Sequence, residues 1–264
     1  MTGARLNLAA ALADALRRLP DMARGAGGSW IAATALVLIC ALDLFEGWAN
    51  VALGAATALA ALAAFGAMTR IAVTPDLVAA RRLGLGPLGF QLTRTEARLA
   101  GAVLLCGLFM TIMLSLLALV ALALFGAAGL DAEAVRERDW GAVGPVWKLA
   151  LLTLVGLVVL GTPVLLLVRL SLFAAATVGR GRMTSLGATA LTNGAIVALL
   201  AGLAACAIPT LVWLALAGSG VLTGAAAIIV GSLAVAGLQA PLTTGFLGAA
   251  YRQSEGRELL GDMG

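Results

Sequence analysis

Histidine is missing from this sequence, and charged residues of both signs are scarce. The chain has 264 residues, of which 11% are charged and 62% are hydrophobic. Without histidine, the sequence excludes histidine–metal sites, histidine-based acid/base catalysis and Ser-His-Asp triads. A soluble domain has roughly a quarter of its residues charged, so these charges are too few to cover a water-soluble surface. We therefore expect an all-α protein whose helices lie in lipid.

Cysteine is also rare, and its positions indicate neither a disulfide framework nor a metal site. Cys40, Cys106 and Cys206 all lie inside apolar stretches, far apart in the sequence. Cysteines in such surroundings act as small buried hydrophobic side chains. No spacing typical of metal ligands is present. The sequence therefore indicates no cofactor.

Six apolar segments are long enough, or nearly long enough, to cross a bilayer, which takes about 20 residues. They are roughly residues 30–46, 50–69, 97–126, 145–170, 194–217 and 221–250. We predict one integral membrane domain over residues 1–264, a polytopic bundle of six transmembrane helices with amphipathic surface helices. Pro163, Pro209 and Pro241 fall within these segments and should kink their helices.

The arginines predict the orientation of the chain in the membrane. If the N-terminus is cytoplasmic, the cytoplasmic segments hold fourteen arginines, against Arg136, Arg138 and Lys148 on the other side. Cytoplasmic loops carry such an excess of basic residues. The wealth of alanine, glycine and arginine is typical of a GC-rich bacterial genome. We therefore expect a bacterial inner-membrane protein with both termini in the cytoplasm.

Three cytoplasmic segments carry local patterns. Leucines at helical spacing predict an amphipathic surface helix over residues 5–19, ended by Pro20. Thr93 and Glu96 match a capping box, which would start the third spanning helix near Thr93. Residues 171–193 read as two short surface helices split by Gly179-Arg180-Gly181-Arg182.

Gly84-Leu-Gly-Pro-Leu-Gly89 formally matches a dinucleotide-binding glycine motif. The motif needs a preceding strand and a following helix within a soluble βαβ unit, and neither is predicted here. Pro87 also removes one backbone N–H from the supposed phosphate cradle. We interpret the segment as a glycine-rich turn at the membrane surface.

Seven arginines near this turn and on the same face form the candidate binding site. One interpretation is topology determination with general attraction to anionic headgroups, and the other is a shared headgroup-binding pocket. Because the arginines lie at membrane edges rather than in one patch, they predict membrane lipids, and not nucleic acid, as partners. A protein partner or homo-oligomer stays open. The seven are Arg81, Arg82, Arg94, Arg98, Arg169, Arg180 and Arg182.

Three ionisable residues are predicted at the outer edge of the membrane. Asp43 and Glu46 end the first segment, and Lys148 begins the fourth at the same depth. We predict an ion pair between Lys148 and one of the two carboxylates. The alternative is proton coupling through Asp43, since ionisable groups within membranes are often functional.

One stretch resembles a known family. Arg169, Ser171 and Leu172 close one helix, and Leu191, Thr192 and Gly194 open the next after an intervening surface segment. This resembles a motif in bacterial six-helix membrane proteins related to the membrane domain associated with glycerophosphodiester phosphodiesterases. Asn193 and the apolar residues after Gly194 depart from the pattern. The resemblance implies a membrane domain of unknown biochemical role, and not the phosphodiesterase activity, which belongs to a separate soluble barrel.

Two function hypotheses follow. The first is a non-enzymatic bilayer protein that engages lipid headgroups or a membrane partner through its basic cytoplasmic face. The second is a small transporter or channel for an apolar or lipid-like molecule, which would need a cavity reaching Thr162, Thr210 or Gln239. No pair of ionisable residues in the sequence points to an active site, so we do not expect an enzyme.

Overall fold

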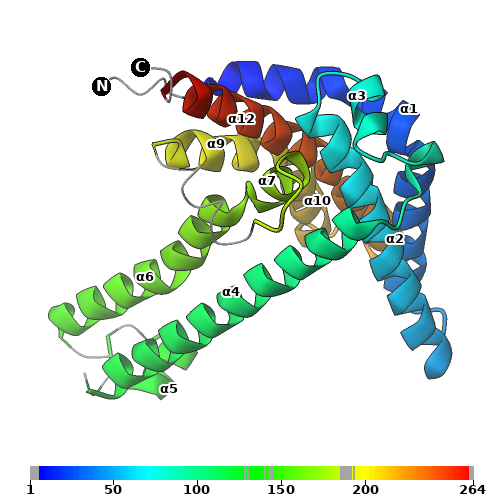
Figure 1. Ribbon diagram of the computed structural model, residues 1–264. Helices are drawn as coiled ribbons and strands as arrows, with labels where there is room; N and C mark the ends of the chain where they lie inside the picture. Colours follow the sequence, from blue (N-terminus) through cyan, green and yellow to red (C-terminus); the bar gives the residue numbers. More distant parts are fainter. Residues whose placement is uncertain are drawn as a thin grey trace.

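The computed structural model describes residues 6–127, 129, 131–139, 141–142, 145–184, 192 and 194–261 (Figure 1). Within these ranges the chain forms helices and turns and contains no strand, which confirms the predicted all-α fold. By length and composition, five helical stretches can cross a membrane, and there are six if the bent pair Ile196–Cys206 and Ile208–Gly218 counts as one span. Six spans were predicted.

Among the described residues, nine helical elements build the spans. They are α1 (Leu8–Ala41), α2 (Trp48–Val73), α4 (Arg94–Ala127), α6 (Val146–Leu170), α9 (Ile196–Cys206), α10 (Ile208–Gly218), α11 (Gly224–Ser232), the π-helix η2 (Leu233–Gln239) and α12 (Ala240–Gly261). In the described part of the chain, four short elements connect them: α3 (Leu77–Arg82), η1 (Pro87–Gly89), α5 (Ala132–Glu137) and α7 (Phe173–Gly179).

The observed course of α1 corrects the predicted bounds of the surface helix and of the first span. Instead of a surface helix ended by Pro20 and a separate span over 30–46, α1 runs unbroken through Pro20 and ends at Ala41. Figure 1 shows its first part lying across one end of the molecule and its second part turning to run beside α2. Ala11, Ala15 and Met22 are buried along one face of α1, so packing holds the helix together on both sides of the proline.

Another correction concerns α7, which was predicted as a surface helix. Its residues Ala174 to Val178 are buried, and α7 packs against α2, α4 and α12. Three successive alanines let neighbouring helices approach closely, so the helix lies in the interior. The second surface helix predicted in this segment falls mostly outside the described residues.

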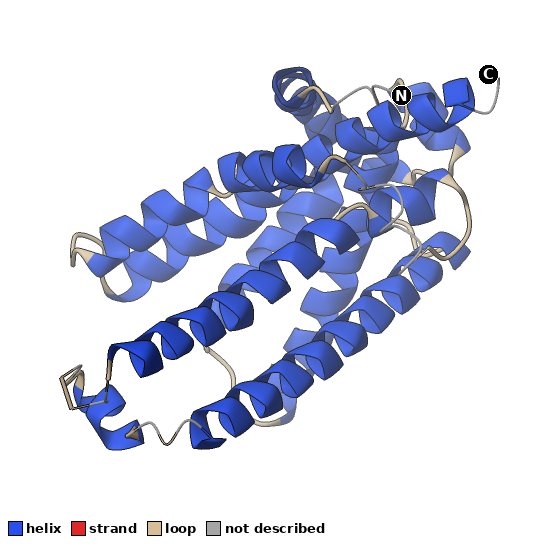
Figure 2. Cartoon of the chain, turned by 90° about the vertical axis from the view of Figure 1, so that its left-hand side faces the viewer, coloured by secondary structure: helices blue, strands red, loops and turns tan. Residues whose placement is uncertain are grey.

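The spanning helices diverge from a common core. Figure 1 shows α4 and α6 running together to one side, while α1 and α2 run to the other. Figure 2 shows long helices paired along their lengths. Leu104 and Leu122 on α4 are 73% and 70% exposed, and Leu157 on α6 is 66% exposed. Such apolar surfaces need hydrocarbon around them, so the chain is a membrane-embedded protein.

Two of the three predicted proline sites disturb their helices. The chain bends by 50° between α9 and α10, just before Pro209. η2 ends at Gln239, two residues before Pro241, whereas α6 continues through Pro163 as one helix.

In a π-helix each backbone N–H donates to the carbonyl five residues earlier, as the N–H of Ala240 does to the carbonyl of Val235. In the same pattern, a backbone N–H at position 241 would donate to the carbonyl of Ala236. Proline has no N–H to give, and the indole Nε1 of Trp30 donates to the Ala236 carbonyl instead, at 2.9 Å.

Candidate functional site

The seven predicted arginines all lie near the ends of helices. Arg81 and Arg82 end α3, Arg94 and Arg98 lie in the first turns of α4, and Arg169 is in the last turn of α6. Arg180 and Arg182 follow α7. Six of these side chains are exposed, and Arg180 is half-buried.

The structure shows two local contacts of these arginines. Arg98 donates to the carbonyl of Gly181, which brings the start of α4 to the turn that holds Arg180 and Arg182. Arg81 lines a pocket of about 330 Å³ with Arg24, a residue outside the predicted set. The hypothesis of one shared headgroup pocket stays a prediction.

A buried ion pair that the sequence analysis missed fixes the position of the loop between α2 and α4. The side chain of Arg70, at the end of α2, is fully buried and pairs with the nearly buried carboxylate of Glu96. Arg70 Nε donates to the carbonyl of Leu83 at 3.0 Å, and its Nη2 donates to Thr93 Oγ1 at 3.3 Å. One guanidinium thus ties α2, the end of α3 and the start of α4 together.

The capping box is confirmed in one of its two halves. Glu96 Oε2 accepts from the backbone N–H of Thr93 at 2.9 Å, as predicted. The Thr93 hydroxyl oxygen accepts from the backbone N–H of Thr95 at 3.3 Å, rather than from that of Glu96. Glu96 therefore caps α4 with one oxygen while the other pairs with Arg70.

Another cluster that contains an arginine joins α7 to α12. Arg180 Nε donates to Glu255 Oε1 at 3.1 Å, and the buried hydroxyl of Tyr251 donates to the same oxygen. A Cβ atom at Gly179 would lie 2.7 Å from the Tyr251 ring, so glycine is required there. Arg180 is thus held by an internal carboxylate, unlike the other predicted arginines.

The glycine-rich turn packs against α1. A Cβ atom at Gly89 would lie 2.7 Å from Ala26 Cα, and one at Gly28 would lie 2.7 Å from Leu88 Cβ. Gly84 and Gly89 have φ angles of 88° and 81°, which glycine adopts without strain. The motif therefore serves helix–loop packing.

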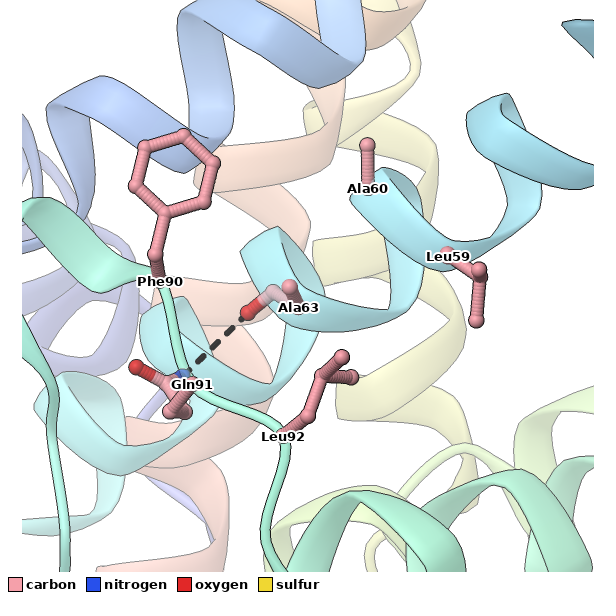
Figure 3. Close-up of a pocket in the computed structure, with 6 residues that line it drawn as sticks. All are labelled: Leu59, Ala60, Ala63, Phe90, Gln91 and Leu92. Carbon is pink, nitrogen blue, oxygen red and sulfur yellow. Dashed lines mark hydrogen bonds between the residues drawn. The ribbon is translucent and has the colours of Figure 1, made fainter.

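Next to this turn lies an apolar pocket of about 370 Å³ (Figure 3). Gln91 is buried at its edge, where its Nε2 donates to the carbonyl of Ala63 at 3.3 Å and its Oε1 accepts from the backbone N–H of Gly86 at 3.0 Å. Gln91 is thereby held at both ends of its amide. The remaining lining residues offer apolar side chains suited to hydrocarbon: Leu59, Ala60, Ala63, Phe90 and Leu92.

The predicted outer-edge ion pair is not formed. Lys148 Nζ donates to the carbonyl of Gly129 at 3.1 Å and lies 5.9 Å from the Trp147 ring centroid. Asp43 accepts a long hydrogen bond of 3.5 Å from Asn50, and Glu46 is exposed. The two hairpins diverge in Figure 1, and this carries the start of α6 away from the turn after α1.

The described residues include no group of three or more histidine, cysteine, aspartate or glutamate side chains placed to hold a metal ion. Cys106 and Cys206 are buried, Cys40 is half-buried, and all three are free thiols. What the arrangement offers instead is guanidinium groups that face water beside apolar helices.

Comparisons with family models, curated proteins and solved structures found no match. The resemblance around Arg169 and Gly194 to a family of six-helix membrane proteins stays a prediction. The chain is a helical, membrane-embedded protein with arginines at several of its helix ends.

Proposed function

We propose that this chain is a multi-pass protein of the bacterial cytoplasmic membrane, with both termini in the cytoplasm, that engages anionic lipid headgroups through its exposed arginines. The observation that carries this proposal is that five of these arginines have no side-chain partner among the described residues. Arg81, Arg82, Arg94, Arg169 and Arg182 are exposed, and their side chains have no hydrogen-bond or ion-pair partner among the described residues.

The carboxylates near these arginines are engaged elsewhere. Glu96 pairs with Arg70, Glu255 pairs with Arg180, and Asp76 caps α3 by accepting from the backbone N–H of Ala79 at 2.7 Å. The exposed positive charges are therefore left for an external anion. A basic residue near an anionic membrane surface gains about 1 kcal/mol. The proposed role is binding without catalysis.

The test measures the preference of the protein for anionic lipid. The protein is reconstituted in bilayers that contain spin-labelled phosphatidylglycerol or phosphatidylcholine, and the motionally restricted fraction is measured by electron paramagnetic resonance. Replacing the five partnerless arginines with glutamine should remove most of the preference for phosphatidylglycerol.

The matched control replaces Arg136 and Arg138, which are exposed at the other end of the helices, with glutamine. This variant should keep the preference of the natural sequence. An equal preference in the natural sequence and the five-arginine variant would contradict the proposal.

A second candidate function has one structural feature in its favour. Two interrupted spans meet where Thr210 Oγ1 donates to Gln239 Oε1, and broken helices of this kind hold substrates in many transporters. A groove of about 420 Å³ lies beside η2, lined by Trp30, Thr34, Leu233 and other mostly apolar residues. It suits an apolar or lipid-like molecule. Movement of a fluorescent lipid across proteoliposomes, lost on Gln239→Leu substitution, would favour this role.

A further inference from the structure

A second basic pocket, separate from the seven predicted arginines, lies between the first part of α1 and α12. These two helices pack against each other at the end of the molecule where α1 begins and α12 ends (Figure 1). The pocket has a volume of about 450 Å³. Its lining consists of Ala10, Asp14, Arg17, Arg18, Ala249, Arg252 and Gln253.

The charges that line this pocket do not balance. Asp14 is the one carboxylate in the lining, against three guanidinium groups, which leaves a formal charge of +2. Asp14 Oδ2 pairs with Arg252 Nη2, and Asp14 Oδ1 lies 3.8 Å from Arg18 Nε. One carboxylate therefore orients two arginines across two helices.

Arg18 is held in place by the end of α2. Its Nη1 donates to the carbonyls of Ile71 and Thr74, at 3.1 Å and 2.5 Å. Only 13% of its side chain is exposed. Arg18 therefore contributes fixed positive charge to the pocket, and its position does not depend on a ligand.

Arg252 and Arg17 have guanidinium N–H groups without a hydrogen-bond acceptor among the described residues. Arg252 Nη1 is the one buried side-chain nitrogen or oxygen without a hydrogen-bond partner among the described residues. Leaving a buried donor unpaired costs about 1–3 kcal/mol, and more for a charged group, so an anionic acceptor is favoured there. Arg17 is exposed and has no side-chain partner in the described part of the chain. The pocket thus has a deficit of acceptors as well as of negative charge.

We propose that this pocket binds a phosphate monoester, with Arg17 and Arg252 donating to the phosphoryl oxygens. The two negative charges of the monoester balance the +2 of the lining, whereas a phosphodiester or a carboxylate supplies one. Guanidinium groups match phosphate oxygens with paired, charge-assisted hydrogen bonds. The small side chains of Ala10 and Ala249 leave room for the ester group. The monoester is the headgroup of a phosphatidate or a soluble compound of the same chemistry.

Two sets of measurements test the site and identify the source of the phosphate. Isothermal titration of the detergent-solubilised protein with glycerol 3-phosphate tests a soluble monoester. Native mass spectrometry of the protein from nanodiscs compares retention of phosphatidate, a monoester, with that of phosphatidylglycerol, a diester. We expect at least one monoester to be preferred about fivefold or more over the matching diester, with glycerophosphoglycerol, which carries one negative charge, as the soluble diester.

Arg17→Gln is the main variant, because Arg17 is exposed and its loss leaves the fold intact. It should reduce monoester binding about fivefold or more, while Arg136→Gln, which changes an exposed arginine at the other end of the helices, should leave it unchanged. Arg252→Lys keeps the charge but loses the forked donor, and should also weaken binding. Thermal unfolding reports whether each variant is folded.

Binding of glycerol 3-phosphate supports a soluble ligand, and selective retention of phosphatidate alone supports a lipid headgroup. Equal binding of monoester and diester, no binding of either monoester, or full binding by Arg17→Gln would each overturn the proposal. The site does not depend on the exposed arginines of the proposed function. Their five-residue glutamine variant should therefore still bind the monoester, which separates the two proposals.

Discussion

The guanidinium of Arg70 and the carboxylate of Glu96 form an ion pair that is shielded from solvent. Their side chains are 0% and 2% exposed. A buried ion pair has a desolvation cost comparable to its electrostatic gain, so its removal as a unit is tolerated far better than the loss of one partner. The pair links residues 26 positions apart in the sequence and sets how α4 leaves the loop after α3.

Glu96→Gln should destabilise the protein by about 3–5 kcal/mol, because Arg70 then stays buried without a counter-charge. The glutamine amide can still accept from the Thr93 N–H, so the cap of α4 is kept. Denaturant unfolding in detergent micelles measures the change. A double variant, Arg70→Met with Glu96→Gln, should lose less stability than Glu96→Gln alone. A loss below about 1 kcal/mol for Glu96→Gln would show that the pair is accessible to water.

Trp30→Phe should destabilise the protein by about 1–3 kcal/mol, because the carbonyl of Ala236 then loses its donor within the membrane. Pro241→Ala supplies a backbone N–H that can pair with the same carbonyl. The effect of Trp30→Phe should therefore be smaller in the Pro241→Ala background. A double-mutant cycle by unfolding measures this coupling. Strictly additive effects would mean that the indole and the proline act independently.

Gly248→Ala should destabilise the protein, because a Cβ atom there would lie 2.4 Å from Ala72 Cβ and 2.7 Å from its backbone. Overpacking of this kind costs about 1–3 kcal/mol. Gly156→Ala is the matched control within a spanning helix, where a Cβ atom meets nothing within 4 Å. The control should be neutral or slightly stabilising, since alanine favours a helix. Equal thermal stabilities of the two variants would contradict the close contact of α2 and α12.

The long spans could be predicted from the sequence because their apolar runs are continuous. The segments 97–126 and 145–170 closely match α4 (Arg94–Ala127) and α6 (Val146–Leu170). The course of α1 could not be predicted, because Pro20 is a local stop signal. The packing of Ala11, Ala15 and Met22 that overrides it is a tertiary effect. The π-helix before Pro241 likewise depends on a donor, Trp30, from another helix.

In the candidate sites, too, the contacts that depend on tertiary packing could not be predicted from the sequence. The exposed arginines could be found from their positions beside apolar segments. Nothing in the sequence distinguishes Arg70 from them, although its side chain is buried and theirs are not. The capping box of Thr93 and Glu96 placed the Glu96 carboxylate at the start of α4, but it did not indicate that Arg70 pairs with it. Asp14 and Arg252 are 238 positions apart, and only the packing of α1 against α12 brings them together.

The central claim, a membrane-embedded chain whose basic helix ends share the cytoplasmic side, is tested most directly by cysteine labelling in cells. In a background with Cys40, Cys106 and Cys206 replaced by alanine, single substitutions Arg81→Cys, Arg182→Cys, Glu46→Cys and Glu133→Cys are treated with a membrane-impermeant maleimide. The account predicts labelling at positions 46 and 133 in intact cells, and at 81 and 182 only after the membrane is opened. Labelling of 81 and 182 from opposite sides would contradict it.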